Sequence, residues 1–324
     1  MLNKRQRIGE PGNRRIGETG KHPFSASPFL PLHDFNGRIL FDVPMKEYTS
    51  FKIGGIADVM AFPKDENDLI NVIEFASNKG FPVFALGRGT NLLVRDNGIR
   101  GVIINLSEGF KEISWIGNDA AVVGAGVMLV ELINLCKDRG LSGLEFAIGI
   151  PGTIGGAVFM NAGAYGSEIK DMVEKIEAVD MHGQKHSFDN AALKFSYREC
   201  KLPADMIVTR AHLKFKKEAP EEIKKKIKEF KERRKATQAI ILPNAGSIFK
   251  NPPGLSAGRL IEESGLKGVK LGGAQISEIH GNYIVNLGNA SAMDVLALIA
   301  MARDKVFKAK GILLETEIKV VGED

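Results

Sequence analysis

Two glycine-rich stretches contain the residues of this chain that are best suited to holding a ligand. They are Gly87-Arg88-Gly89-Thr90-Asn91-Leu92 and Gly149-Ile150-Pro151-Gly152-Thr153-Ile154-Gly155-Gly156. An apolar run that we expect to form a strand precedes each of them, at residues 82–85 and 144–147. Glycine permits tight turns and a close approach of the backbone to a ligand, and clustered backbone N–H groups bind anions. Together the two loops predict a dinucleotide whose pyrophosphate lies between them.

The loops do not match the commonest nucleotide-binding signatures. A Rossmann site requires G-x-G-x-x-G, but Gly87-Arg88-Gly89 has no third glycine, and neither has Gly124-Ala125-Gly126. No G-x-x-x-x-G-K-[ST] sequence occurs either, which argues against a nucleotide triphosphatase. We therefore expect a dinucleotide-binding fold of another kind.

Four further clusters contain side chains suited to anion binding or proton transfer. They are Phe195-Ser196-Tyr197-Arg198, Asn244-Ala245-Gly246-Ser247-Ile248-Phe249-Lys250-Asn251-Pro252, Gly272-Gly273-Ala274-Gln275 with His280 and Asn282, and Leu314-Glu315-Thr316-Glu317-Ile318-Lys319. Strand alternation places Glu315, Glu317 and Lys319 on one face, which taken alone indicates solvent. Ser247 alone is compatible with a turn serine and Arg198 with a surface cation. No Ser-His-Asp set is visible, so a hydrolase is poorly supported.

Composition limits the class of protein. The length of 324 residues allows two domains. Residues 1–22 contain six basic and two acidic side chains, a net charge of +4, so the rest carries only about +1 of the total of +5. We therefore expect no nucleic-acid partner, and a basic tail of this composition is expected to be disordered.

Cysteine spacing and hydropathy narrow the class further. Cys136 and Cys200 have no metal-ligand spacing and indicate reduced thiols in a cytoplasmic protein with no metal. The longest apolar run, residues 295–302, is too short to span a bilayer. The tail lacks the apolar segment of a secretory signal. We expect no membrane partner.

Hydrophobic periodicity predicts alternating strands and helices. Helices are expected around 69–76, closed by Gly80, and at 129–138, 221–235 and 291–311; strands are expected at 83–86, 102–105, 112–116, 121–124, 173–181, 206–216 and 313–321, with a hairpin turn at His182-Gly183. This pattern indicates an α+β sheet domain and then a second strand–helix series after the charged helix.

Taken together, the motifs resemble one family. The order L-G-x-G-T-N-L-L-V, P-G-T-I-G-G-A, N-A-G-A-Y-G, S-Y-R, G-S-x-F-K-N-P and L-E-x-E-I-K, preceded by Thr49-Ser50-Phe51-Lys52-Ile53-Gly54-Gly55, is similar to that of the UDP-N-acetylenolpyruvoylglucosamine reductases. The resemblance covers about residues 38–322. The glycine loops alone would indicate only the wider superfamily, so another FAD-dependent dehydrogenase or oxidase of that superfamily is the alternative.

The resemblance implies an α+β fold and an activity. It implies a basic tail (1–37), a two-lobed FAD-binding domain of the vanillyl-alcohol-oxidase/PCMH type (38–217), and a smaller α/β substrate-binding domain (218–324). Non-covalent FAD would pass a hydride from NADPH to UDP-N-acetylglucosamine enolpyruvate, giving UDP-N-acetylmuramate for peptidoglycan. We expect a monomer of the shorter type, since no insertion with a further tyrosine follows Arg198.

The resemblance also assigns roles to individual residues. Arg198 would hold the enolpyruvyl carboxylate, Ser247 would donate a proton, and Glu317 matches the second catalytic position. Cofactor contacts would be made by Gly87, Arg88, Gly89, Thr90, Asn91, Leu92, Gly149, Pro151, Gly152, Thr153, Gly155, Gly156 and Asn161. Substrate contacts would be made by Tyr165, Arg234, Lys235, Gln238, Asn251, Gln275 and Lys319.

Two positions qualify these assignments. Cys200 stands where the family has a serine, which leaves the polar contact of that position open. A serine hydroxyl is a weak acid that needs polarisation, and Lys250, which is close in sequence, is one candidate to polarise Ser247.

Overall fold

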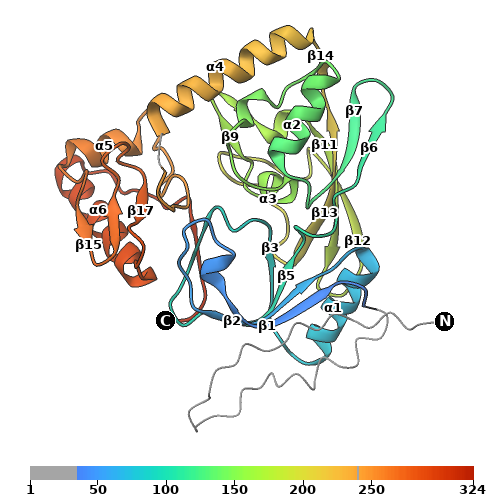
Figure 1. The fold of residues 1–324 in the computed structure, drawn as a ribbon, viewed down its shortest axis with the longest axis horizontal. Coiled ribbons are helices and arrows are strands. Elements are labelled where there is room, and N and C mark those ends of the chain that lie inside the picture. The colour runs from blue at the N-terminus through green and yellow to red at the C-terminus, as the bar shows by residue number, and fades with distance from the viewer. Residues whose placement is uncertain (1–34, 239–240) are drawn as a thin grey trace.

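The first domain contains two sheets. The structure, a computed structural model, describes residues 35–238 and 241–324 (Figure 1), so nearly all of the expected tail lies outside the described residues. The first sheet has the order β1-β2-β5-β3, in which β2, β5 and β3 are parallel and β1 is antiparallel to β2. Its strands are β1 Arg38–Pro44, β2 Ile56–Phe62, β3 Val83–Leu86 and β5 Ile99–Asn105. The expected strands at 83–86 and 102–105 are confirmed.

Helix α1, Glu66–Asn78, covers this first sheet. Asp65 caps it by accepting a hydrogen bond from the backbone N–H of Asp68 at 2.9 Å. Its apolar residues at helical spacing, Leu69, Val72, Ile73 and Ala76, are buried, as their sequence pattern predicts. Gly80, with φ of +69°, ends the helical segment in the left-handed region that glycine adopts readily.

The second lobe is a five-stranded sheet of order β12-β11-β13-β7-β6 in which every pair is antiparallel. Its strands are β6 Ile113–Ile116, β7 Ala120–Gly124, β11 Val173–Asp180, β12 Lys185–Asp189 and β13 Met206–Lys214, and its helices are α2 Leu129–Asp138 and α3 Ile154–Phe159. Gly183, with φ of +77°, forms the expected turn between β11 and β12.

Two expected strands are wrong in whole or in part. Residues 144–147 were expected to be a strand, but Glu145–Ala147 form a 3-10 turn, η3. Glu145 stabilises this turn, because its carboxylate accepts the backbone N–H of Gly143 at 2.7 Å. The closing strand is β18, Lys319–Val321, only; it pairs in parallel with β4, Leu92–Val94.

Helix α4, Pro220–Gln238, joins the two domains along the top of Figure 1. It was expected to open the C-terminal domain at residue 218. However, its buried residues Ile223 and Ile227 belong to the core of the first domain, and it contacts α2 and η3. The boundary between the hydrophobic cores of the two domains therefore lies after α4, because the apolar side of this highly charged helix packs on the first domain.

The C-terminal domain is built around a small antiparallel sheet, β15-β16-β17. Its elements are α5 Ala257–Glu263, β15 Lys270–Leu271, β16 Ala274–Ile276, β17 Ile284–Asn286 and α6 Ala292–Lys310. Helix α6 begins at a capping box of Ser291 and Asp294 and ends at Gly311, as predicted. The remaining short elements are η2 Met45–Glu47, β8 Leu141–Ser142, β9 Gly163–Ala164, β10 Ser167–Glu168, η4 Ile169–Asp171 and β14 Lys216–Lys217.

The segment Thr49–Ile53 connects the two domains through packing and hydrogen bonds. Phe51 is fully buried in the core of the C-terminal domain, and Asn286 donates from its side-chain amide to the Phe51 carbonyl at 3.0 Å. Ser50 bridges two functional loops, since its N–H donates to Gly89 at 3.1 Å and its hydroxyl to Asn244 at 2.7 Å. The first glycine loop is thereby held against the loop that carries Ser247.

Candidate active site

A cavity of about 1150 Å³ lies between the two domains. Both glycine loops line it, as do Arg198, Ser247 and Glu317. Residues 87–92 all face it, and so do Gly149, Pro151, Gly152, Thr153, Gly155 and Gly156. The volume exceeds that of an ordinary small-molecule pocket and suits a dinucleotide together with a second ligand.

The glycines of these loops have two different reasons to lack a side chain. A Cβ on Gly152 or Gly156 would meet only a threonine hydroxyl, Thr90 at 3.6 Å or Thr153 at 3.7 Å. A Cβ on Gly89 would instead lie 2.2 Å from the Tyr48 carbonyl oxygen, and one on Gly155 would lie 2.8 Å from a core methyl group. Gly152 and Gly156 thus leave cavity space that a larger residue would fill, as a bound pyrophosphate requires.

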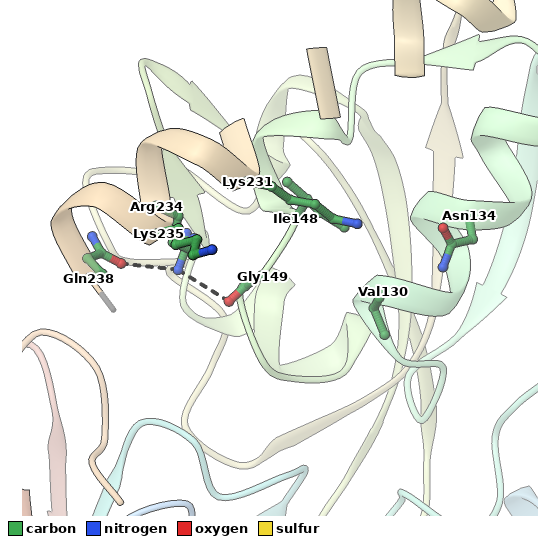
Figure 2. Close-up of a pocket in the computed structure, with 8 residues that line it drawn as sticks. All are labelled: Val130, Asn134, Ile148, Gly149, Lys231, Arg234, Lys235 and Gln238. Atoms are coloured by element: carbon green, nitrogen blue, oxygen red, sulfur yellow. Dashed lines mark hydrogen bonds between the residues drawn. The ribbon is translucent and has the colours of Figure 1, made fainter. Parts of the chain in front are cut away.

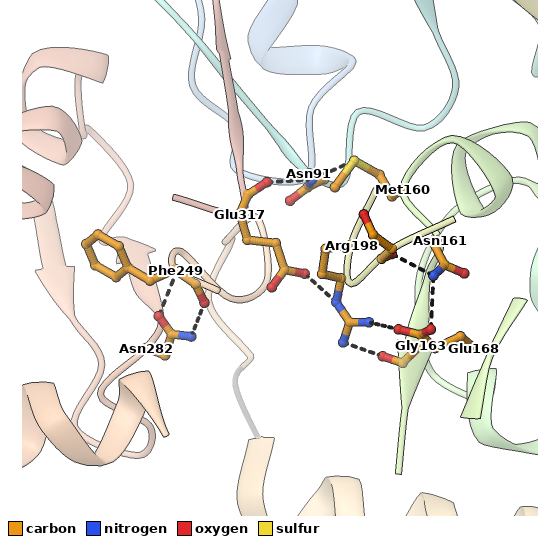
Figure 3. A network of polar contacts seen from close by, with 10 residues as sticks. Asn91, Met160, Asn161, Gly163, Glu168, Arg198, Phe249, Asn282 and Glu317 are labelled. Carbon is orange, nitrogen blue, oxygen red and sulfur yellow. Dashed lines mark hydrogen bonds and ion pairs between the residues drawn. The ribbon is translucent and has the colours of Figure 1, made fainter. Parts of the chain in front are cut away.

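Arg198 is presented by a tight turn and held by acidic and carbonyl groups. Its φ is +59°, and Ser196 and Glu199 exchange backbone hydrogen bonds on either side of it. Its Nε donates to Glu317 Oε1 at 3.0 Å and its Nη2 to the Gly163 carbonyl at 2.6 Å, with Glu168 at 3.9 Å from Nη1 (Figure 3). The guanidinium is therefore fixed, and N–H groups remain on both terminal nitrogens for an anion.

Glu317 is held where the domains meet. Its backbone N–H donates to Ile248 at 2.8 Å, and its carbonyl accepts from the Asn91 side-chain amide at 3.2 Å. The side chain is only 17% exposed, so the solvent interpretation of this face is wrong for Glu317. Burial raises the pKa of the Glu317 carboxyl, although the charges of Arg198 and Lys250 partly offset this.

Ser247 lies in a loop that is held by the side chains of Asn244 and Asn282. Asn244 accepts the N–H of Gly246 at 2.9 Å, and Gly246 has φ of +77°. Beyond the serine, Phe249 pairs with Thr316 in an isolated antiparallel bridge. This pairing brings Ser247 and Glu317, which are far apart in sequence, to one cavity.

Five of the expected substrate residues line the same cavity: Tyr165, Arg234, Gln238, Asn251 and Lys319. Tyr165 stacks on Phe230, with ring centroids 4.8 Å apart. Arg234 donates from Nη1 to both Gly149 and Gln238, each at 3.3 Å (Figure 2). The Nε of Arg234 is buried with no hydrogen-bond partner among the described residues. It is therefore an unused donor beside the second glycine loop.

Three expected ligand contacts are not brought to this cavity. Lys235 lines a neighbouring hollow of about 360 Å³ instead. The Gln275 amide donates to Gly268 and to Glu278, each at 3.1 Å. Asn161 is fully buried, and its amide donates to Glu168 at 3.0 Å and to the Ser196 carbonyl at 2.8 Å. Asn161 therefore supports the turn and the acid that hold Arg198, and a cofactor contact by it is not supported.

Two expectations about neighbouring residues also change. The Lys250 ammonium bonds Glu315 at 2.6 Å and does not line the cavity as the structure describes it, so it is not placed to polarise Ser247. Cys200 is buried, with its sulfur 4.0 Å from the Leu193 carbonyl, and burial raises its pKa to about 11. The thiol at this position fills core space beneath the Arg198 turn.

Sequence reasoning missed Tyr283, which also lines the cavity. It is 8% exposed, and burial raises its pKa against the opposing effects of the Arg234 charge and a hydrogen bond with Ser247. The only sequence signal for Tyr283 is its place directly after Asn282, next to a cluster whose polar members include His280 and Asn282.

Two other kinds of site are absent from the described residues. Within residues 35–238 and 241–324, no helix is long and apolar enough to cross a membrane. In the same ranges, no three His, Cys, Asp or Glu side chains form a group that could hold a metal ion.

Comparison with known proteins places both domains. A profile described as "FAD binding domain" matches residues 57–189, and one described as "UDP-N-acetylenolpyruvoylglucosamine reductase, C-terminal domain" matches residues 236–321. The second match begins near the end of α4, in agreement with a boundary between the two hydrophobic cores at that point.

Whole-length relatives agree with the profiles. The UDP-N-acetylenolpyruvoylglucosamine reductase of Caldanaerobacter subterraneus subsp. tengcongensis is 47% identical over 89% of this chain and 95% of its own length. That of Syntrophomonas wolfei is 46% identical over 91% and 98%. The crystal structure of the Thermus caldophilus reductase matches at a TM-score of 0.76 and 39% identity over 88% of this chain and 98% of the other. The chain therefore belongs to the UDP-N-acetylenolpyruvoylglucosamine reductase family, with a two-lobed FAD-binding domain followed by that family's C-terminal domain.

Proposed function

We propose that this protein uses FAD and NADPH to reduce UDP-N-acetylglucosamine enolpyruvate to UDP-N-acetylmuramate, a step in making peptidoglycan precursors. The observation that carries the proposal is the meeting of Arg198, Ser247 and Glu317 at the cavity lined by both glycine loops. These residues come from three separate segments, and each supplies a function that the reduction of an enolpyruvyl ether requires.

The residues present fit the cofactor. The pyrophosphate of FAD would be held by residues 87–92 and 149–156, where Gly152 and Gly156 leave room for it. When bound, the flavin supplies hydride transfer from NADPH to the terminal carbon of the enolpyruvyl group.

Arg198 stabilises the charge that develops on the substrate. Hydride addition to the terminal carbon leaves negative charge on the adjoining carbon and its carboxylate. The N–H groups of Arg198 that Glu317 and Gly163 do not use can bind this carboxylate as a charge-assisted pair. Because the guanidinium is already oriented, little reorganisation is needed as the charge grows. Glu317 acts here as the carboxylate that orients Arg198.

Ser247 then delivers a proton to the adjoining carbon. Ser247 lines the cavity from the side of the C-terminal domain, whereas Arg198 and the glycine loops line it from the first domain. The serine therefore completes the reduction from a separate wall of the cavity.

The rate of flavin reoxidation by substrate is expected to fall at low pH, with an apparent pKa above the ordinary glutamate value. Burial raises the pKa of Glu317, so lowering the pH protonates it sooner than an exposed glutamate and weakens its hold on Arg198. In stopped-flow measurements, Glu317→Gln should have a lower maximal rate, and its rate should not fall further at low pH. Glu315→Gln, which changes an exposed neighbour, should still show the fall in rate at low pH. A rate that rises as the pH falls would instead make Glu317 a proton donor.

We further propose that one chain acts alone in the cytoplasm. Arg198, Ser247 and Glu317 all come from the same chain, so no second subunit is needed to complete the site. Both cysteines are free thiols, as is usual in a reducing compartment.

The deciding experiment is anaerobic titration of the purified holoprotein. NADPH should bleach the flavin absorbance, and UDP-N-acetylglucosamine enolpyruvate should restore it with formation of UDP-N-acetylmuramate. Reoxidation by a simple 2-oxo acid or a sugar ketone, but not by the enolpyruvyl ether, would place the protein with other flavin oxidoreductases of the superfamily. NADH in place of NADPH measures the preference for the donor.

A further inference from the structure

We propose that Tyr283 is a positioning residue that orients the Ser247 hydroxyl and donates to its oxygen as the proton leaves. The inference rests on the proposed function, because it refines how Ser247 delivers its proton. It also replaces the role first expected of Lys250, whose ammonium is bound to Glu315.

Asn282 aligns the two residues. Its backbone carbonyl accepts from Ile248 at 2.9 Å. Its side chain accepts from the Phe249 N–H at 2.9 Å and donates to the Phe249 carbonyl at 2.8 Å (Figure 3). These three bonds clamp the segment just after Ser247 to the residue just before Tyr283. Both Ser247 and Tyr283 consequently line the same cavity, and the Ser247 hydroxyl lies near enough to the phenol to lower its pKa.

The direction of a hydrogen bond between the two hydroxyl groups follows from the other partner of the phenol, Gln238. The Tyr283 hydroxyl donates to Gln238 Oε1 at 3.0 Å, and a carbonyl oxygen can only accept. The single phenolic proton is therefore used, so the Ser247 hydroxyl is the donor and the Tyr283 oxygen the acceptor. Before substrate binds, the Ser247 proton is directed toward Tyr283.

Rotation of two hydroxyl groups converts this arrangement into a relay. The Ser247 O–H bond breaks as its proton joins the electron pair on the substrate carbon. As that proton moves, the phenol O–H turns from Gln238 to the serine oxygen and transfers its proton there, since a phenol is a far stronger acid than an aliphatic alcohol. Solvent water returns a proton to the phenolate when product leaves. Burial raises the pKa of Tyr283, which keeps the phenol in its protonated form before substrate binds.

Neighbouring side chains hold the phenol in this position. The His280 ring meets the Tyr283 ring edge-on, with centroids 5.0 Å apart at 68°. Gln238 is itself bonded by Arg234 at 3.3 Å (Figure 2). The end of α4 and the cluster before β17 therefore fix Tyr283 from two sides.

The test is the Tyr283→Phe variant, alone and combined with Ser247→Ala. Tyr283→Phe keeps the ring and should keep its flavin, its rate of reduction by NADPH and the KM for the enolpyruvyl substrate. Flavin reoxidation by that substrate should slow about tenfold, as expected for loss of one hydrogen bond to a developing charge. In the Ser247→Ala background, Tyr283→Phe should change the rate by less than twofold, because Tyr283 acts through the serine.

Two readouts separate this role from a purely structural one. A proton inventory in mixtures of H₂O and D₂O should be curved for the wild type and linear for Tyr283→Phe, because two protons move in one and a single proton in the other. Tyr48→Phe removes a phenol that is not among the described lining residues of the cavity and should leave both half-reactions unchanged. Equal losses from Tyr283→Phe in the two backgrounds, or no loss at all, would overturn the inference. If the wild type is not reoxidised by the enolpyruvyl ether, the proposed function fails instead.

Discussion

Ser247→Ala is expected to be reduced by NADPH at close to the normal rate and to be reoxidised by substrate about 10²–10⁴-fold more slowly, the usual range for loss of a proton donor. The hydroxyl has no part in moving hydride from NADPH to the flavin, whereas protonation of the substrate carbon depends on it. Stopped-flow flavin absorbance measures both halves in one instrument.

Two further variants control the Ser247 experiment. Ser247→Cys should recover part of the rate, because a thiol is a better acid although it is longer and softer. Ser264→Ala removes another hydroxyl of the C-terminal domain, one bonded to the Leu260 carbonyl at 2.8 Å, and should change neither half-reaction. If Ser247→Ala slows both halves equally, or neither, Ser247 is a turn residue and another donor must be sought.

Gly156→Leu is expected to purify without flavin. Gly156 lies in α3 with no positive φ, so a side chain there does not strain the backbone. Its Cβ would have one contact, at 3.7 Å to the Thr153 hydroxyl, and a leucine would extend into the cavity where the pyrophosphate is expected. Flavin absorbance per protein and fluorescence after acid release measure the occupancy.

Gly156→Ala is the matched control. Glycine-to-alanine in a helix is favourable by about 0.5–1 kcal/mol, and one methyl group meets only an ordinary contact, so this variant should fold and keep much of its flavin. Far-UV circular dichroism should be the same for both variants. Full occupancy in folded Gly156→Leu would contradict the two-loop cofactor site. Gly89 is a poorer choice, since its Cβ would strike the Tyr48 carbonyl and disturb the fold itself.

Attachment of the flavin is expected to be non-covalent, so acid precipitation should release all of it from the wild type. The described residues that line the cavity include His280 but no cysteine, and the His280 ring packs edge-on against Tyr283. Flavin that stays with the precipitated protein would contradict this expectation.

Local features of the fold were predictable because the signals lie within a few residues of one another. The apolar spacing of α1 and the capping box and terminal glycine of α6 are examples. So is the turn at Gly183. In each case one helix face or one backbone conformation satisfies the pattern, whatever the rest of the chain does. The run 144–147 misled because a short apolar segment does not distinguish a strand from a buried turn.

The sequence by itself determined the family, the glycine loops and the residue types that could handle a carboxylate and a proton. Only the tertiary structure decided which of those side chains meet. Sequence alternation places Glu315 and Glu317 on one face, yet Phe249 pairing with Thr316 and the bond from Arg198 to Glu317 cover most of Glu317 and leave Glu315 exposed. In the same way Asn282 places Tyr283 beside Ser247, while Lys250 turns to Glu315. These outcomes depend on hydrogen bonds between segments that are distant in sequence, and no local spacing encodes them.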